Sequence, residues 1–252
     1  MKIDVIGHRG ASGYAPETTL AAYRLAIQMG VDFVETDVHM LRDGSLVAIH
    51  DADLKRTTNG RGWVADFALE ELKALDAGSW FNEAHPEKAR PEYAGLRVPT
   101  LQEVIDLVKE SSIGLLIEIK DPERYPPHLE SSLLSLVRNS QMEKRTRFLS
   151  FSAQSLRKVK ELDAAIPTVL LISKALKDPV KATLEVPADE LGLRHALVTP
   201  AIVDEARRQD LLISVWTVDE PEDMRRMIEL GVDRITTNYP DRLIGMLKSR
   251  SS

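Results

Sequence analysis

The sequence contains no cysteine, which excludes disulfide bonds, thiolate metal sites and cysteine nucleophiles. It also lacks any run close to the ~18 consecutive apolar residues that a membrane-spanning helix needs, so no membrane span is expected. The first residues carry an acid, Asp4, and have no apolar core of the kind found in secretory signal peptides. Together these absences favour a cytoplasmic protein.

An excess of positive charge is also absent. The 33 Lys and Arg residues are outnumbered by 39 Asp and Glu residues, and both kinds are spread along the chain. Because contacts to a phosphate backbone require a basic surface, nucleic acid is not an expected partner. The length of 252 residues, 43% of them hydrophobic, is typical of one α/β barrel, so a single domain spanning residues 1–252 is expected.

Short β-branched apolar runs alternate with segments of helical periodicity along the chain, which is typical of βα units around a parallel sheet. No glycine-rich dinucleotide turn follows the first run, and this favours a closed barrel over an open doubly wound sheet. We therefore predict an α/β fold, a (β/α)8 TIM barrel. Its eight strands are predicted at residues 3–7, 33–38, 115–119, 147–151, 168–172, 190–193, 212–218 and 234–237.

Proline and glycine mark the ends of two predicted helices. Pro16 is expected to open the first helix and Gly30 to end it, and Pro221 and Gly231 bound a later one. This arrangement follows the preference for proline in the first turn of a helix and glycine just past its end.

One stretch interrupts the alternation. After the second strand, Asp43-Gly44 predicts a hairpin turn into a further strand, and a long segment follows before the next barrel helix. We predict residues 51–97 to be a small insertion over the barrel mouth, with a helix at 66–75 and with Trp63 and Trp80 in a core of its own.

Acidic residues stand at the ends of two predicted strands. Glu35 and Asp37 are two residues apart and so share one face, and Glu118 and Lys120 repeat the arrangement on the third strand. Two acids in a buried strand cost several kcal/mol unless they are neutralised. Carboxylates without Cys or His select Mg2+ or Ca2+ over zinc. Structural salt bridges, including a Glu118–Lys120 pair, remain a second interpretation.

Two histidines follow strands that lead to the same end of the barrel. His8 follows the first strand and His50 the inserted one, so the two could serve as acid and base, although each could also be structural. Arg9 offers a bidentate donor for a phosphoryl group. Trp216, at the end of the seventh strand, could be a core aromatic or a substrate-facing wall. The other histidines are expected at the surface or in the core: His39, His85, His128 and His195.

From residue 7 to 241 the sequence resembles the glycerophosphodiester phosphodiesterase family, through motifs in a specific order and spacing. These are His8-Arg9-Gly10, Pro16-Glu17-Thr18-Thr19, Glu35-Thr36-Asp37, Asp43-Gly44, His50-Asp51, Arg56-Thr57-Thr58-Asn59-Gly60, Leu72 to Gly78, Pro99-Thr100-Leu101, Glu118-Ile119-Lys120, Trp216-Thr217-Val218 and Thr237-Asn238-Tyr239-Pro240. The chain has Thr18 where the family usually has asparagine, which puts an amide contact there in doubt, although the threonine could cap the helix.

The resemblance implies that Glu35, Asp37 and Glu118 bind one divalent cation. It also implies that His8 and His50 act as general acid and base and that Arg9 and Lys120 meet the phosphate.

The reaction that the resemblance implies is hydrolysis of a small-molecule glycerophosphodiester to sn-glycerol 3-phosphate and an alcohol. One alternative is a phospholipase D-like hydrolase of lysophospholipids on the same barrel, which would need an apolar groove or loop near the mouth. Another is a non-catalytic, metal-stabilised binding protein, although such a protein has no need of two proton-transfer groups. The oligomeric state is not specified by the sequence.

Overall fold

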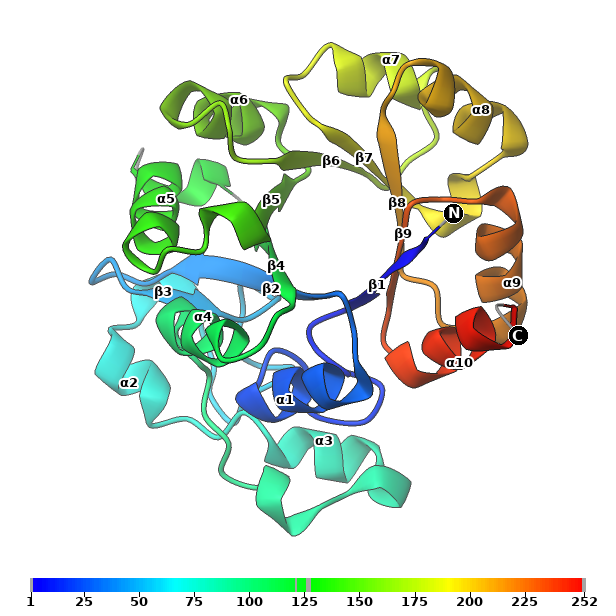
Figure 1. Cartoon of the computed structure of the whole chain (residues 1–252). Coiled ribbons are helices and arrows are strands. Elements are labelled where there is room, and N and C mark those ends of the chain that lie inside the picture. The colour runs from blue at the N-terminus through cyan, green and yellow to red at the C-terminus, as the bar shows by residue number, and fades with distance from the viewer. Residues whose placement is uncertain (1, 121, 126–127, 251–252) are drawn as a thin grey trace.

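The computed structural model describes residues 2–120, 122–125 and 128–250. Eight parallel strands form a closed barrel in which the first strand pairs with both the second and the last, and one antiparallel strand extends the sheet (Figure 1). The strands are β1 (Asp4–Gly7), β2 (Phe33–Met40), β3 (Leu46–Ala48), β4 (Gly114–Ile119), β5 (Thr146–Ser150), β6 (Thr168–Ile172), β7 (Glu190–Arg194), β8 (Leu212–Trp216) and β9 (Arg234–Thr237).

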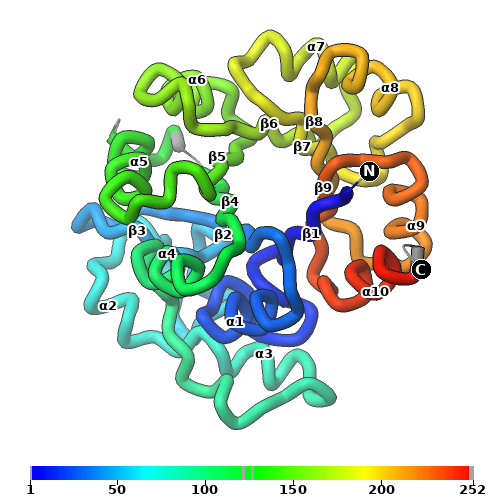
Figure 2. The backbone as a smooth tube through the Cα atoms, in the orientation of Figure 1, coloured from blue at the N-terminus to red at the C-terminus, as the bar shows by residue number. Residues whose placement is uncertain are grey.

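Helices surround this barrel, and in the described part of the chain none of them is long and apolar enough to cross a membrane. They are α1 (Leu20–Met29), α2 (Leu69–Lys73), α3 (Ser79–Ala84), α4 (Leu101–Lys109), α5 (Leu129–Asn139), α6 (Ala153–Leu162), α7 (Pro179–Leu184), α8 (Pro200–Arg208), α9 (Pro221–Leu230) and α10 (Pro240–Arg250). The backbone trace in Figure 2 follows the closed ring from β1 round to β9.

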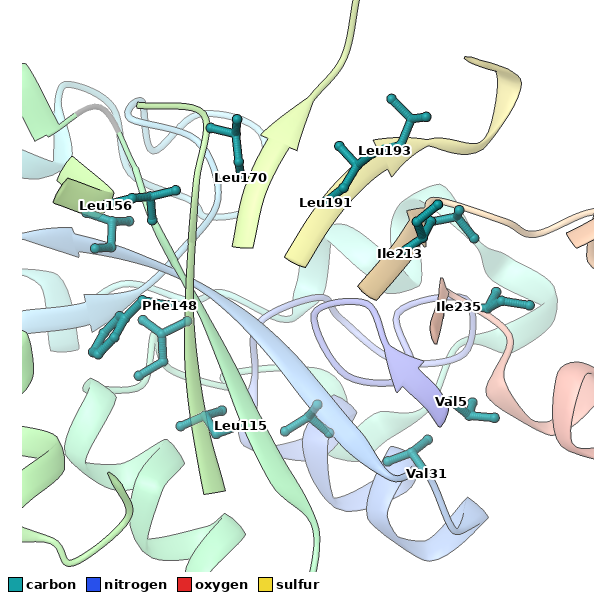
Figure 3. Packing of buried hydrophobic residues seen from close by; sticks show 14 of the residues in the cluster. Val5, Val31, Leu115, Phe148, Leu156, Leu170, Leu191, Leu193, Ile213 and Ile235 are labelled. Atoms are coloured by element: carbon teal, nitrogen blue, oxygen red, sulfur yellow. The ribbon is translucent and has the colours of Figure 1, made fainter. Parts of the chain in front are cut away.

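Neighbouring residues of one strand serve two different cores, because successive side chains point to opposite faces. Leu115 belongs to the core between the strands and the helices, whereas Leu116 belongs to the cluster inside the barrel. Figure 3 shows the outer core, with Leu191, Ile213 and Ile235 on successive strands. Full burial of each such side chain stabilises the fold by roughly 1.5–3 kcal/mol.

All eight predicted barrel strands are confirmed, including the short one at residues 190–193, with differences only at their ends. The second strand continues to Met40 because residues Val38 to Met40 pair with β3. The strand predicted at 212–218 ends earlier, at Trp216. The helix that begins at Pro221 is capped by Gly231, which has a left-handed backbone conformation, so both of its ends are as predicted.

The first helix begins later than predicted. Thr19, and neither Pro16 nor Thr18, caps α1, since the Thr19 side chain accepts a hydrogen bond from the amide of Ala22 at 3.4 Å. The backbone of Thr18 has a φ of 55°, a left-handed conformation that cannot continue into a helix. The end at Gly30 is as predicted, in the left-handed conformation.

The conformation of Thr18 leads to a prediction about stability. A β-branched residue at positive φ is strained by about 1–2 kcal/mol, whereas asparagine adopts this conformation more readily. We expect Thr18→Asn to raise the free energy of unfolding by ~1 kcal/mol, measured by chemical denaturation. Thr19→Ala, which removes the cap, should lower it by about the same amount. A Thr18→Asn protein no more stable than the wild type would contradict this account.

The helical structure of the insertion is divided into shorter pieces than predicted. Instead of one helix at 66–75 it has a 3-10 turn, Val64–Asp66, and the short α2. The two are separate because the carboxylate of Asp43, on the hairpin, accepts a hydrogen bond from the amide of Leu69 at 2.8 Å. In Figure 1, α2 and α3 lie to the outside of α4 and α1.

The predicted position of Trp63 in the core of the insertion is wrong. Trp63 is 51% exposed and lies beneath the guanidinium of Arg124, 5.1 Å from its ring centre. Trp80 is half-buried and packs edge-on against Phe81. Trp80 therefore lies against a small buried cluster that includes Phe81 and Tyr93. A second small core is aliphatic and includes residues of the hairpin: Leu41, Val47, Ile49, Leu54, Val64, Leu72, Ala77 and Val98.

Candidate active site

Three buried carboxylates meet at the carboxyl end of β2 and β4. Asp37 is the register partner of Glu118 across the two strands, and Glu35 lies two residues earlier on the same face as Asp37. One carboxylate oxygen of each residue lies within 4.8 Å of the others. The structure therefore brings together the three acids that the sequence singled out.

Burial and mutual repulsion perturb the pKa values of these acids. Burial, followed by the charges of Asp37 and Glu118, raises the pKa of Glu35 well above its ordinary value. Burial and the charge of Asp37 raise the pKa of Glu118 to about 7. Although burial opposes it, the positive charges of Arg9 and Lys120 hold the pKa of Asp37 below its ordinary range. Without a counter-ion, the cluster therefore keeps a proton near neutral pH.

The donor set of this cluster fits a hard divalent cation. Both carboxylate oxygens of Asp37 are buried and accept no hydrogen bond within the described part of the chain. They make ionic contacts instead: Asp37 Oδ2 lies 3.1 Å from Arg9 Nε, and Asp37 Oδ1 lies 3.5 Å from Lys120 Nζ. Buried carboxylate oxygens with unused lone pairs are the ligands that Mg2+ and Ca2+ take in proteins.

Arg9 and Lys120 add two positive charges beside the acids. Arg9 has a left-handed backbone with a φ of 55°; its amide donates to Glu35 at 2.9 Å and its guanidinium contacts Asp37. Lys120 Nζ lies 2.8 Å from Glu118 Oε1, so the ion pair that the sequence left open is present. Together with Arg9, Lys120 supplies two positive charges against three acids, so the cluster keeps one negative charge when all three acids are ionised.

His8 is held through its Nδ1 atom. Asn238 Nδ2 donates to the carboxylate of Asp219 at 2.6 Å, so Asn238 Oδ1 faces His8 and accepts from His8 Nδ1 at 2.7 Å. The lone pair of the neutral ring is therefore on Nε2. Burial and the charge of Arg9 lower the pKa of His8 to about 4, so the ring is neutral at pH 7.

His50 is held in the same way by a different partner. Its Nδ1 lies 2.5 Å from Asp51 Oδ1. Although burial opposes it, hydrogen bonds from Arg56 and His50 lower the pKa of Asp51 to about 2, so Asp51 is ionised and His50 Nδ1 donates. His39, buried in the core as expected, lies with its Nε2 atom 3.1 Å from the backbone carbonyl of His50. Both candidate catalytic rings thus leave Nε2 for a ligand.

An aromatic pair lies on the other side of the mouth. A cavity of about 260 Å3 is lined by Glu118, Lys120 and Phe151 among others. Phe151, which sequence reasoning missed, is 47% exposed and meets Trp216 edge-on at 5.6 Å. The indole of Trp216 donates to the carbonyl of Gly192 at 3.1 Å, and its ring packs against the cluster inside the barrel. Trp216 is thus half-buried against this cluster, while Phe151, which meets its ring, lines the cavity.

Sequence reasoning also missed the residues that hold the histidines and Arg9 in place. Glu17, Asp51 and Asn238 were visible only as members of motifs, and Asp219 had no signal of its own. Asp51, Asp219 and Asn238 each follow the end of a strand by one to three residues, whereas Glu17 lies in the longer segment between β1 and α1. A search for acids and amides next to strand-end histidines would have found Asp51 but not the other three.

Comparison with known proteins agrees with this geometry. The glycerophosphoryl diester phosphodiesterase family matches residues 8–242. The chain belongs to this family. It is therefore an enzyme, a phosphoric diester hydrolase, and membership of the family favours this over the non-catalytic binding protein. Members of the family generally depend on a divalent metal, and the acidic cluster described above could hold one.

Two related sequences and one related structure align with nearly the whole length of the phosphodiesterase. It is 43% identical over 249 residues to a glycerophosphodiester phosphodiesterase of Bacillus subtilis, covering 95% of this chain and 85% of the relative. The enzyme of the same name from Caldanaerobacter subterraneus is 39% identical, with 98% and 99% covered. A phosphodiesterase of Oleispira antarctica, solved with the product sn-glycerol-3-phosphate, superposes with a TM-score of 0.89 at 28% identity, covering 97% and 96%.

Proposed function

We propose that the phosphodiesterase hydrolyses glycerophosphodiesters to sn-glycerol 3-phosphate and an alcohol in the cytoplasm, with Mg2+ or Ca2+ bound by Glu35, Asp37 and Glu118. The observation that carries the proposal is the buried carboxylate cluster, whose oxygens lie within 4.8 Å of one another beside two histidines anchored through Nδ1. A bound divalent cation would polarise a phosphoryl oxygen and offset its charge.

The positive side chains and the histidines have separate roles: the former bind the phosphate and the latter transfer protons. Arg9 and Lys120, which lie against Asp37, would donate to the phosphate oxygens and hold the phosphorus beside the histidines. His8 is neutral at pH 7 and would accept a proton at Nε2 from the attacking hydroxyl. To give a proton from Nε2 to the oxygen of the leaving alcohol, His50 must first be protonated, a form that the ionised Asp51 favours although burial lowers the pKa of His50 below its ordinary value. Trp216 and Phe151 would border the organic part of the substrate.

The attacking hydroxyl in this proposal is the glycerol 2-hydroxyl of the substrate itself. Its oxygen bonds to phosphorus as the bond to the alcohol oxygen breaks, which gives a cyclic phosphate. Water then opens the ring, with His50 taking a proton from the water and His8 returning its proton to the 2-oxygen. An oriented internal nucleophile can contribute ~7 kcal/mol over an external one, which favours this route over direct attack by water.

A substrate analogue without the 2-hydroxyl separates the two routes. We expect 2-deoxyglycerophosphocholine to bind without measurable cleavage, because its internal nucleophile is missing. Binding is followed as competitive inhibition of the parent substrate, and cleavage as release of choline. Hydrolysis of the analogue at a rate comparable to that of the parent would indicate direct attack by water and would leave the phosphodiesterase activity itself intact.

The raised pKa of Glu118 leads to a prediction about cation binding. Below its pKa of about 7 the cluster holds a proton that must leave before a cation can bind. The affinity for Mg2+ or Ca2+ should therefore fall as the pH drops below 7, by about tenfold per pH unit for one displaced proton. Calorimetric titration of the protein between pH 5.5 and 8 measures this slope. A constant affinity across that range would contradict the assignment of these acids.

A panel of phosphodiesters tests the proposed function. Glycerophosphocholine, glycerophosphoethanolamine and glycerophosphoglycerol should all be cleaved, with the phosphate left on glycerol. A lysophospholipid belongs in the panel because Phe151 and Leu176, on the loops after β5 and β6, are 47% and 49% exposed and supply the apolar loop residues that this substrate class would need. A preference for the lysophospholipid over all three glycerophosphodiesters would favour that alternative.

A further inference from the structure

Arg56, in the insertion, forms two forked contacts at the edge of the barrel mouth. Its Nε and Nη2 donate to the two carboxylate oxygens of Asp51 at 2.6 and 3.2 Å. Its Nη1 and Nη2 donate to the two carboxylate oxygens of Glu17 at 2.8 and 2.7 Å. One planar guanidinium therefore pairs with two carboxylates at once, an arrangement that depends on its rigid set of five N–H donors.

Each of these carboxylates holds a different residue of the candidate active site. Asp51 Oδ1 accepts from His50 Nδ1 at 2.5 Å, and Glu17 Oε1 accepts from Arg9 at 2.9 Å. His50 follows β3 and Arg9 follows β1, two strands that pair with different stretches of β2. Arg56 thus joins two segments of the mouth that are distant in the sequence. Through Asp51 and Glu17 it also connects His50, which is proposed to protonate the alcohol, with Arg9, which is proposed to hold the phosphate.

The burial of the partners makes this link specific. The side chain of Glu17 is only 12% exposed and that of Asp51 28%, while that of Arg56 is 44% exposed. Without Arg56, Glu17 would keep Arg9 as a partner and Asp51 would keep His50, but nothing would fix the two carboxylates relative to each other. Because Arg56 itself is 44% exposed and each carboxylate keeps a second partner, the loss of Arg56 should affect geometry more than folding stability.

We propose that Arg56 is a positioning residue that holds His50 and Arg9 in fixed relative positions through Asp51 and Glu17. It acts without touching the substrate, and the inference rests on the roles proposed above for His50 and Arg9. Lysine in its place would keep the charge but present a single ammonium, which cannot form two forks. The expected consequence is a lower kcat for Arg56→Lys as well as for Arg56→Ala, by about 10–100-fold, the range found when partners that orient a functional residue are removed.

Arg42 supplies the matched control. It lies at the end of the hairpin, its side chain is 61% exposed, and it forms one ion pair with Glu71 at 3.1 Å, away from the mouth. Arg42→Lys and Arg42→Ala should keep wild-type kcat. Millimolar guanidinium added to Arg56→Ala should restore part of the lost kcat by occupying the vacated position, whereas cation affinity and thermal stability should differ little between all four variants and the wild type.

A spectroscopic measurement tests the same inference without turnover. The 15N chemical shifts of the His50 imidazole, assigned by comparison with His50→Gln, report the hydrogen bond from Nδ1 to Asp51. We expect these shifts to change in Arg56→Lys and Arg56→Ala and to stay unchanged in the Arg42 variants.

The outcomes separate this inference from the proposed function. If the wild type does not cleave glycerophosphodiesters, the proposed function fails, and the His50 shifts alone decide whether Arg56 orients that ring. If the wild type cleaves them and Arg56→Lys retains kcat within twofold with unchanged His50 shifts, the positioning role is overturned. Loss of activity together with lost cation binding or a lowered unfolding temperature, without rescue by guanidinium, would indicate a purely structural role and would also overturn it.

Discussion

His8→Ala and His50→Ala should each lose at least ~100-fold in turnover while remaining folded, since general acid or base catalysis contributes that much or more. The structure explains why a loss of turnover is expected for both variants. His8 is fixed by Asn238 and His50 by Asp51, each through Nδ1, so each ring has only Nε2 available for proton transfer. Because the two rings act on one reaction, the double variant should be little worse than either single variant.

The control for these variants is His128→Ala. His128 is exposed at the start of α5 and should keep wild-type turnover when it is replaced. Far-ultraviolet circular dichroism and thermal unfolding establish that each variant is folded. If either His8→Ala or His50→Ala kept near wild-type turnover, the histidine replaced in that variant would have a structural role and not a catalytic one.

Exhaustive chelation should abolish turnover, and Mg2+ or Ca2+ should restore it. The cluster of Glu35, Asp37 and Glu118 keeps three acids buried, and a cation at this position is expected to contribute several kcal/mol to the transition state. This corresponds to a loss of roughly 1000-fold or more when the cation is removed. Asp37→Asn should bind neither cation in a calorimetric titration, because Asp37 is the acid that stays ionised.

The matched control for Asp37→Asn is Asp43→Asn. Asp43 is exposed on the hairpin, where it accepts bonds from the amides of Ser45 and Leu69, and its replacement should leave cation affinity unchanged. Undiminished turnover after chelation, with no cation detectable by elemental analysis, would show that the reaction does not need a metal.

Local patterns in the sequence were sufficient for the barrel and for the three acids that the structure brings together. A strand in a closed barrel is apolar on both faces, so an acid at its end is conspicuous, and this singled out Glu35, Asp37 and Glu118. What the pattern could not supply is the register between strands. Asp37 lies opposite Glu118 only because β2 and β4 pair at that offset, which depends on the whole ring.

The errors lie where tertiary contacts override local preferences. Pro16 suggested a helix start, but Thr18 is held in a left-handed turn, its amide donating to the carbonyl of Arg9 at 3.1 Å, and the helix begins only after Thr19. Trp63 was expected in a core, yet its partner is Arg124, from a loop about sixty residues later. Arg56 had no local signal for its role, since its two acceptors come from different loops.

The measurement that tests the central claim most directly is phosphorus NMR of glycerophosphocholine incubated with the purified enzyme, with Mg2+ or Ca2+ and with chelator. The account predicts that the diester resonance is replaced by that of sn-glycerol 3-phosphate when the cation is present, and that the diester persists when it is chelated. Formation of phosphocholine in place of sn-glycerol 3-phosphate, or equal conversion in the presence of chelator, would contradict it.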